Sequence, residues 1–480
     1  MKGNRLGSLL FLIAILLSFV SCTSVEKAEV LPPEIPEEVK TVPDITGWWE
    51  GSLPLPGDIQ LLLQFEVVTA PDGYSSFLSI RQQAIDSLQV HTTVFDEATG
   101  SITFDIAALQ ATFTGLLDAT ASPNTIEGTF SQGGALLPLV LEKNHTVSHR
   151  LQEVVAPYPY ISEDVSIPTA NGFSLAGTIT RPDDKAKHPC VILVTGSGLQ
   201  DRNEEILGHK PFLVIADALT KAGIVVIRYD DRGFAQSGGD GKNATSLDFA
   251  DDAASVLSFL KTKEYVQQDT IGVLGHSEGA IIAGILAADN PSVAFVILLS
   301  GPGLAGMDLV LQQTRALVQG QGFSEEQIEA IIATNKKLYT TALDSSVSLE
   351  ARKLSLEAML MASGYPAEKA LEQVNALLSP WYLTFLALDP VTYFSRVSCP
   401  VLIVSGTKDL QVPTERNVSS LQQALASNGN MEVSVKVLDG LNHLLQPAIT
   451  GQPTEYETIE TTIDPSVLSL LSSWILSVTN

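Results

Sequence analysis

The chain has few cysteines and few basic residues. It contains three cysteines among 480 residues, and 28 lysines and arginines against 54 aspartates and glutamates, for a net charge of −26. Cys190 and Cys399 each open a predicted buried strand, so we expect unreactive core thiols, with a disulfide between them as the less favoured alternative. An acidic surface repels nucleic acid and anionic lipid headgroups, so neither is expected as a partner.

Metal-binding patterns are also missing. The sequence has seven histidines, and no two of them show the His-Glu-x-x-His spacing of a zinc site. We therefore predict no metal and no cofactor. Apolar residues make up 45% of the chain, which is enough for packed cores, and the length suggests two or three domains.

The first 22 residues have the pattern of an export signal. Lys2 and Arg5 precede an apolar run, Leu9 to Val20, that is too short for a stable membrane span. The end of this segment, residues 18–22, resembles the lipobox of bacterial lipoproteins, with Phe19 where leucine is usual. That resemblance implies that Cys22 is lipidated and becomes the first residue of an envelope-anchored chain, whose membrane contact is made through the lipid alone. Ordinary signal cleavage is the alternative.

Composition then divides the chain into further parts. Residues 23–42 are rich in Glu and Pro and predict an extended tether. Residues 43–143 contain short runs with period-two alternation separated by turn clusters, as in 61–67, which predicts a small antiparallel β-barrel or sandwich. Trp48 and Trp49 are expected in its core rather than as a ligand-stacking pair. Residues 144–160 form a linker, after which strands alternate with helices in residues 161–480.

Ser277 occupies the centre of a Gly-x-Ser-x-Gly pentapeptide, residues 275–279. The apolar run 271–274 precedes it and the small apolar run 280–283 follows it. This strand-to-helix context is typical of a nucleophile elbow, in which the flanking glycines allow a tight corner. His276 is expected to point into the fold, away from Ser277.

Asp409 and His443 complete a catalytic triad in the chain order nucleophile, acid, histidine. Each follows a predicted parallel strand, where open α/β sheets place their sites. No acidic residue follows the strand 295–299, the other place where such folds carry their acid, so Asp409 has no strong competitor.

Residues from about 160 to 480 resemble bacterial α/β-hydrolase esterases near the dienelactone-hydrolase and prolyl-oligopeptidase-type serine hydrolases. The segments 191–204 and 225–233 and the elbow carry this resemblance. It implies a mostly parallel, doubly wound α/β sheet, with 191–204 as the oxyanion loop. The backbone N–H groups of Glu278 and Ser197 are the expected oxyanion donors, with Gly198 as the alternative to Ser197. Thr195-Gly196 stands where the family usually has His-Gly.

Two other segments have expected structural roles. Asp230, Asp231 and Arg232 follow an earlier strand and are expected to brace the oxyanion loop rather than to act in catalysis. About a hundred residues without strand character separate strands 295–299 and 401–404, which predicts a helical cap at about 303–390. Its aromatic and methionine side chains are expected mainly in the cap core, with the pocket wall as the alternative; they are Met359, Met361, Trp381, Tyr382 and Phe385.

The sequence thus predicts a serine hydrolase of the bacterial cell envelope that cleaves carboxylic esters of small molecules. An aminopeptidase, an acyl-peptidase or a thioesterase could use the same triad. A surface binding protein with an inactive hydrolase scaffold is the alternative that is not an enzyme.

Overall fold

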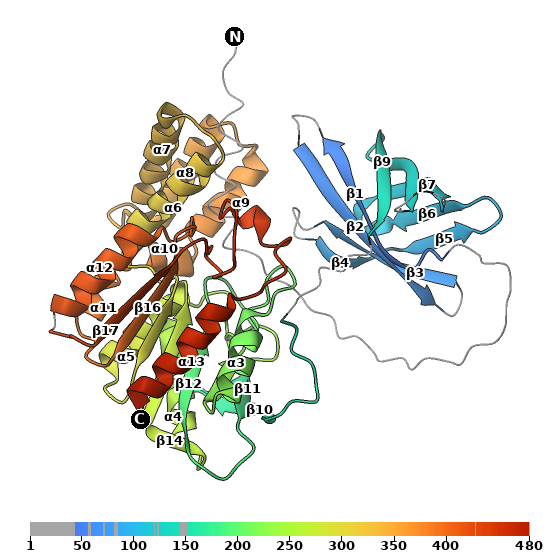
Figure 1. Ribbon diagram of the computed structural model, residues 1–480. Coiled ribbons are helices and arrows are strands. Elements are labelled where there is room, and N and C mark those ends of the chain that lie inside the picture. The colour runs from blue at the N-terminus through green and yellow to red at the C-terminus, as the bar shows by residue number, and fades with distance from the viewer. Residues whose placement is uncertain are drawn as a thin grey trace. The chain divides into compact units, whose positions relative to one another are not determined.

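The computed structural model describes residues 44–55, 59–70, 73–80, 85–119, 121, 124–144, 152–427 and 429–479. The export signal and the tether predicted for residues 1–42, including Cys22, lie outside these ranges. The chain forms two compact units, a smaller one before residue 150 and a larger one from that point onward (Figure 1). No helix of the described residues is long and apolar enough to cross a membrane.

The smaller unit is an antiparallel β-barrel. Eight strands pair in a closed circuit, in the order β1, β2, β3, β5, β6, β7, β8, β9 and back to β1, and β4 pairs alongside β3. The strands are β1 Gly47–Leu55, β2 Ile59–Ala70, β3 Gly73–Ile80, β4 Ile85–Gln89, β5 Thr92–Asp96, β6 Ser101–Ile106, β7 Ala111–Asp118, β8 Thr125–Gln132 and β9 Ala135–Asn144. Of the two architectures expected from the alternating pattern, the structure has the barrel.

Alternate side chains of these strands fill the barrel interior. Leu61, Leu63, Phe65 and Val67 are buried, and the residues between them are partly exposed, as the period-two pattern predicted. Phe65 stacks on the ring of Phe104 with 4.4 Å between the ring centroids. Trp49 is also fully buried, and its indole N–H donates to the carbonyl oxygen of Ile45 at 2.8 Å. The expectation of a core role for Trp49 is therefore confirmed.

The larger unit is built on an eight-stranded sheet in the order β10-β11-β13-β12-β14-β15-β16-β17. β11 is antiparallel to both of its neighbours, β10 and β13. The other six strands, β13, β12, β14, β15, β16 and β17, pair in parallel, so the sheet is mixed but mostly parallel. The strands are β10 Ile161–Pro168, β11 Ser174–Arg181, β12 His188–Val194, β13 Val225–Tyr229, β14 Val266–His276, β15 Val296–Leu299, β16 Val401–Gly406 and β17 Val433–Leu438.

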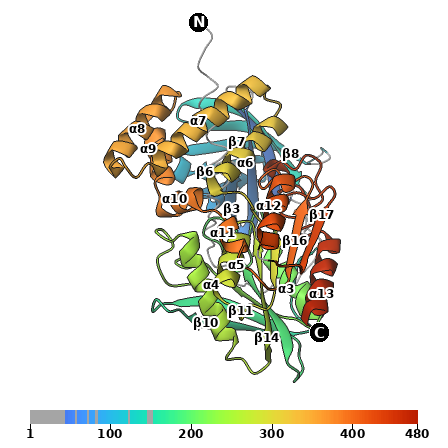
Figure 2. The same cartoon turned by 90° about the vertical axis from the view of Figure 1, so that its left-hand side faces the viewer.

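Helices cover both faces of this sheet (Figures 1 and 2). α3 (Pro211–Lys221) and α13 (Pro465–Thr479) pack on the face that carries Val191 and Leu193 of β12. α4 (Ser246–Leu260), α5 (Glu278–Asp289) and α12 (Thr414–Ser427) pack on the opposite face with Cys190 and Ile192. Neighbouring residues of one strand thus enter different cores, which explains why the central strands are continuous apolar runs.

Six helices lie between β15 and β16, in the region where the sequence predicted a cap. They are α6 Gly306–Gly320, α7 Glu325–Leu343, α8 Leu349–Ala362, α9 Ala367–Leu377, α10 Pro380–Ala387 and α11 Val391–Phe394. A capping box starts α7, because Ser324 and Gln327 exchange side-chain-to-backbone hydrogen bonds. α6 to α10 gather at one end of the sheet, where they can shape the surface over the carboxyl ends of the strands (Figure 1).

Candidate active site

Ser277 lies at the sharp corner between β14 and α5. Its backbone has φ 54° and ψ −121°, a conformation that residues with a Cβ rarely adopt. The flanking glycines are required by close packing: a Cβ on Gly275 would lie 1.9 Å from the carbonyl oxygen of Gly279, and one on Gly279 would lie 2.2 Å from that of Val194. The Gly-x-Ser-x-Gly pattern therefore builds an elbow that presents the Ser277 hydroxyl at the end of the sheet.

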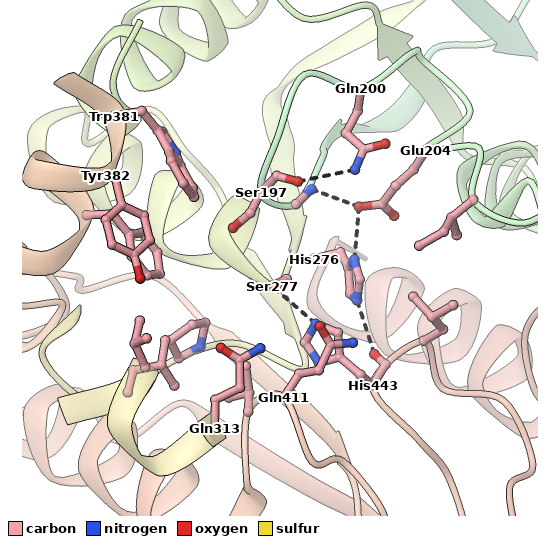
Figure 3. Close-up of a pocket in the computed structure, with 18 residues that line it drawn as sticks. Ser197, Gln200, Glu204, His276, Ser277, Gln313, Trp381, Tyr382, Gln411 and His443 are labelled. Atoms are coloured by element: carbon pink, nitrogen blue, oxygen red, sulfur yellow. Dashed lines mark hydrogen bonds and ion pairs between the residues drawn. The ribbon is translucent and has the colours of Figure 1, made fainter. Parts of the chain in front are cut away.

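The structure brings together the three residues that the sequence predicted as a triad. His443 Nε2 lies 3.0 Å from Ser277 Oγ, and His443 Nδ1 lies 2.9 Å from Asp409 Oδ2 (Figure 3 shows the contact between His443 and Ser277). Asp409 follows β16 and His443 follows β17, and both side chains are buried while Ser277 is half-buried. Such a chain of contacts can carry a proton from the hydroxyl to the imidazole while the carboxylate fixes the ring.

Backbone contacts fix the acid of this triad and the loop that carries its histidine. Asp409 Oδ1 accepts hydrogen bonds from the N–H groups of Gln411 and Val412, at 2.9 and 2.8 Å. In the loop that carries His443, Asn442 Oδ1 accepts from two backbone N–H groups, those of Leu444 and Gln446. The carboxylate and the imidazole are thus held by their own loops before any substrate arrives.

The segment after β12 has the contacts expected of a braced loop. Asp231 accepts hydrogen bonds from Thr195 Oγ1 and from the N–H of Gln200, at 3.0 and 2.7 Å, and burial raises the pKa of Asp231. Asp230 binds the guanidinium group of Arg202 through both of its carboxylate oxygens. These contacts agree with the bracing role expected for the two aspartates.

Arg232, which follows these two aspartates, contacts α4 and not the loop after β12. Arg232 binds Asp252 and Asp248 of α4, with its Nε 2.6 Å from Asp252 Oδ2. It therefore anchors the turn after β13 to the neighbouring helix.

A cavity of about 100 Å³ adjoins Ser277. Ser197 lines it and Gly198 does not, while the N–H of Gly196 is already donated to Glu204 Oε1 at 2.7 Å. Leu309 and Val310 of α6 and three aromatic residues of α10 form an apolar wall; the aromatic residues are Trp381, Tyr382 and Phe385. Figure 3 shows Trp381 and Tyr382 facing Ser197 and Ser277 across this space. These three aromatic residues line the pocket as well as packing within the helices, so the expectation of a core role described them only in part.

Glu278, the residue after the nucleophile, connects the elbow to the inserted helices. Its carboxylate is fully buried, receives a hydrogen bond from Ser246 Oγ at 2.6 Å, and lies 3.0 and 3.1 Å from the indole nitrogen of Trp381. Burial raises the pKa of Glu278, although hydrogen bonds from Ser246, Ser197 and Trp381 oppose that shift. The Glu278 backbone is the expected oxyanion donor, so one residue serves both the elbow and α10.

His276, the residue before the nucleophile, is buried as expected but also borders the cavity. Its Nδ1 lies 2.9 Å from Glu204 Oε1, and its Nε2 lies 3.1 Å from the main-chain oxygen of His443. Burial alone would lower the pKa of His276, but the Glu204 carboxylate, the main-chain oxygen of His443 and the charge of Asp409 together outweigh it, and the pKa is raised. Glu204 is not among the site residues predicted from the sequence, although it lies in the segment 191–204 that carries the resemblance.

Among the described residues, no group of three or more His, Cys, Asp or Glu side chains is arranged to hold a metal ion. Cys190 and Cys399 are both free thiols, and burial raises the pKa of Cys399 to about 11. The thiols are therefore poorly suited to act as nucleophiles.

Comparison with known proteins finds similarity to hydrolases. Residues 210–446 match the family described as "Serine aminopeptidase, S33". The esterase EstD of Thermotoga maritima is 26% identical over 352 residues, which cover 72% of this chain and 75% of the relative. An uncharacterised 31.7 kDa protein of Escherichia coli is 24% identical over 263 residues, covering 53% of this chain and 83% of that protein.

Solved structures of low sequence identity are also similar to the chain. An α/β hydrolase of Penicillium sp. sh18 is 17% identical, with a TM-score of 0.42 over 66% of this chain and 98% of that one. An esterase of Pyrococcus furiosus is 16% identical, with a TM-score of 0.43 over 68% and 96%. The larger unit is thus similar to the serine aminopeptidase S33 family over residues 210–446 and to an esterase over most of the chain, and its mostly parallel sheet is consistent with an α/β-hydrolase fold.

Proposed function

We propose that the protein is a serine esterase that cleaves small carboxylic esters through an acyl-enzyme intermediate. The observation that carries this proposal is the position of His443, with one ring nitrogen 3.0 Å from Ser277 Oγ and the other 2.9 Å from Asp409 Oδ2. A hydroxyl, an imidazole and a buried carboxylate in this order are the components of acyl transfer.

In the proposed reaction, Ser277 Oγ attacks the ester carbonyl while His443 Nε2 takes the hydroxyl proton. The negative charge that develops on the carbonyl oxygen is held by the N–H groups of Ser197 and Glu278, and one such donor is worth roughly 3 kcal/mol of the barrier. His443 then gives its proton to the leaving alkoxide, and the ester bond breaks. A water molecule, deprotonated by His443, attacks the acyl-enzyme and releases the acid.

The pocket favours an ester over the amino terminus of a peptide. An aminopeptidase has to bind a substrate ammonium group, for which a buried site needs an opposing charge. Of the described residues that line the cavity, Glu204 is the one acidic residue, and it already accepts from Gly196 and contacts His276. The similarity to the esterase EstD supports the same choice. Thioesters and acyl-peptides remain alternatives that share the triad.

The test uses a fluorophosphonate, which reacts with activated serines and needs no knowledge of the substrate. We expect a single adduct on Ser277 by peptide mass spectrometry, no adduct in His443→Ala, and hydrolysis of 4-nitrophenyl esters that Ser277→Ala abolishes. Turnover of aminoacyl 4-nitroanilides in place of esters would instead favour the aminopeptidase. Folded protein without any adduct would support a binding protein on an inactive scaffold.

We further propose that the chain is exported and anchored to a bacterial envelope through lipid on Cys22. The support is the sequence of residues 1–22 alone, with its basic start, apolar run and lipobox-like end. In this proposal the Glu- and Pro-rich residues 23–42 separate the folded units from the membrane. Mass spectrometry of the mature amino terminus should find a diacylglyceryl Cys22, and Cys22→Ala should release the protein from membranes. An unmodified terminus would contradict the anchor.

A further inference from the structure

A buried pair of ionisable residues, Glu204 and His276, lies beside the triad but has no part in the proposed proton transfers. Glu204 is 3% exposed and His276 is 8% exposed. Figure 3 shows His276 between the Glu204 carboxylate and the backbone of His443. Burying two charged groups is unfavourable unless they pair, so their position needs a reason beyond packing.

The pair connects three segments of the site by hydrogen bonds. Glu204 Oε1 accepts from the N–H of Gly196 at 2.7 Å, next to the proposed oxyanion donor Ser197. The same oxygen lies 2.9 Å from His276 Nδ1, and His276 Nε2 lies 3.1 Å from the main-chain oxygen of His443. The contacts therefore run from the oxyanion loop, through the residue before the nucleophile, to the backbone of the catalytic histidine.

These contacts also indicate how His276 is protonated. Both of its ring nitrogens face acceptors, a carboxylate oxygen and a carbonyl oxygen, so both have to carry a proton. The ionisable groups around the ring are Glu204, His443, whose ring centroid lies 4.9 Å away, and the more distant Asp409. Apolar side chains such as Phe212 enclose the rest of the surroundings. An imidazolium paired with a carboxylate suits this setting, and it is consistent with the raised pKa of His276.

The backbone around the pair is strained. Seven described residues other than glycine have positive φ, and four of them lie at this site: Glu204 (53°), Ser277 (54°), Ser300 (49°) and Leu445 (59°). Such conformations are unfavourable for residues with a Cβ and persist only where the surroundings hold them. Ser300 Oγ donates to the same oxygen of His443 as His276 does, at 2.8 Å. The bonds of the pair are therefore among those that hold the strained loops in place.

We propose that Glu204 and His276 are a positioning pair, which holds the oxyanion loop and the His443 backbone at a fixed separation as long as His276 is an imidazolium. This inference rests on the proposed serine-hydrolase function. The two residues act through Ser197 and His443, and not by contact with the reacting atoms. When His276 loses its proton, one of the two N–H donors is lost, and either the oxyanion loop or the His443 loop is released.

The test compares the full-length protein with Glu204→Gln. Glutamine keeps the side-chain shape and an acceptor oxygen but removes the charge that opposes the imidazolium. We expect kcat/KM for a 4-nitrophenyl ester to fall roughly tenfold to a hundredfold, since misplacement of a catalytic group by about 1 Å has effects of that order. The alkaline limb of the pH profile should move to lower pH by about one unit or more, because an opposing charge at this distance has that effect on a pKa.

Asp184→Asn is the matched control. Asp184 Oδ1 lies 2.8 Å from His188 Nε2, so this is also a carboxylate–histidine contact, but it is exposed and precedes β12 at the end of the strand opposite the oxyanion loop. The control should leave kcat/KM and the pH profile unchanged. A Glu204→Gln enzyme within twofold of wild type, or one that loses activity without any change in its pH profile, would overturn the proposal, since a merely structural residue gives the second result.

A measurement on the wild-type protein avoids dependence on the folding of a variant. Nitrogen-15 spectra of histidine-labelled protein should show His276 mostly with two ring protons at pH 6.5, where an ordinary imidazole is half protonated, and a mostly neutral His276 ring at that pH would overturn the proposal. The fluorophosphonate reaction separates this result from the enzyme assignment. Wild-type protein without an adduct contradicts the esterase, whereas a labelled enzyme with neutral His276 contradicts only the positioning pair.

Discussion

The two units differ most in the number of polar and charged side chains that they bury. Among the described residues of the barrel, the buried polar side chains are Ser76 and Ser79, and none of the buried side chains is charged. Among its described residues, the α/β unit buries eleven charged or titratable side chains other than tyrosine and cysteine; they are Glu204, His209, Arg228, Asp230, Asp231, Arg232, Asp252, His276, Glu278, Asp409 and His443. Five of them lie at the candidate site: Glu204, His276, Glu278, Asp409 and His443.

This difference separates two ways of building a stable unit. The barrel closes its sheet and fills the interior with apolar side chains, so no backbone edge or charge has to be compensated in its core. The α/β unit leaves one end of its sheet open for loops, and buried charges there persist because each has a partner, as Asp409 and His443 do. Perturbed ionisable groups concentrate at functional sites, and here they mark the unit that carries the chemistry.

The largest expected effects come from two buried aspartates of the α/β unit with different partners. Asp409→Asn should lower kcat by about 10⁴-fold, because an amide no longer fixes the His443 tautomer. Its melting temperature should change little. Asp252→Asn removes the more buried of the two carboxylates that pair with the Arg232 guanidinium, leaves Asp248 as the remaining partner, and should cost up to about 3–5 kcal/mol of stability. Steady-state kinetics should measure the loss of kcat in Asp409→Asn, and urea unfolding should measure the loss of stability in Asp252→Asn. A loss of stability without a loss of kcat in Asp409→Asn, or the opposite result in Asp252→Asn, would contradict the division between catalytic and structural charges.

A substitution in the barrel core should lower the stability of the barrel without changing ester hydrolysis. Phe104→Ala removes a ring that stacks on Phe65 in the barrel core, and should destabilise that unit by about 3–5 kcal/mol. Hydrolysis of a small soluble ester should remain within twofold of wild type at temperatures where the barrel is folded. Calorimetry should show one transition moved and the other unchanged. A parallel loss of esterase activity would mean that the barrel takes part in the reaction.

Several features of the fold and the site could be predicted from the sequence. Period-two alternation predicted the β unit, since interior and exterior side chains of a barrel strand have to differ. The glycines around Ser277 predicted the elbow, because the close approach at Gly275 and Gly279 excludes any Cβ. The order of Ser277, Asp409 and His443 along the chain then predicted which side chains meet, since each follows its own parallel strand.

Other features could not be predicted, for physical reasons. The contacts of Glu204 with His276 and of Glu278 with Trp381 join residues 72 and 103 positions apart, and no periodicity relates them. The pocket wall depends on how α10 packs over the elbow, which the helical pattern of α10 does not determine. The sequence nevertheless held a signal for these contacts. Ionisable residues lie on both sides of Ser277, and ionisable side chains that become buried need partners.

Loss of the contact between Glu278 and Trp381 of α10 should weaken substrate binding, with a smaller effect than the substitutions described above. Trp381→Phe keeps an aromatic ring but removes the N–H that contacts the Glu278 carboxylate, so α10 should be held less firmly over the cavity. A bond of this kind contributes about 1–3 kcal/mol, and we expect KM to rise severalfold with a smaller change in kcat. Trp474→Phe is the control, because Trp474 packs against Phe295 on the other face of the sheet. If both substitutions changed KM equally, the proposed role of the Trp381 N–H in holding α10 over the cavity would be contradicted.

The smallest expected effect is a pH-dependent difference in stability between wild type and His276→Asn. The pKa of His276 is raised in the folded protein above its ordinary value of 6.5, so the folded state holds the proton more tightly than the unfolded state does. The stabilising contribution of this ionisation should be complete below about pH 6.5, and it should be lost as the pH rises through the folded-state pKa. Urea unfolding at a series of pH values should therefore show the difference between the two proteins narrowing as the pH increases. The barrel transition, which contains no part of this pair, should show no such dependence, and a difference that widened with pH would contradict the imidazolium at His276.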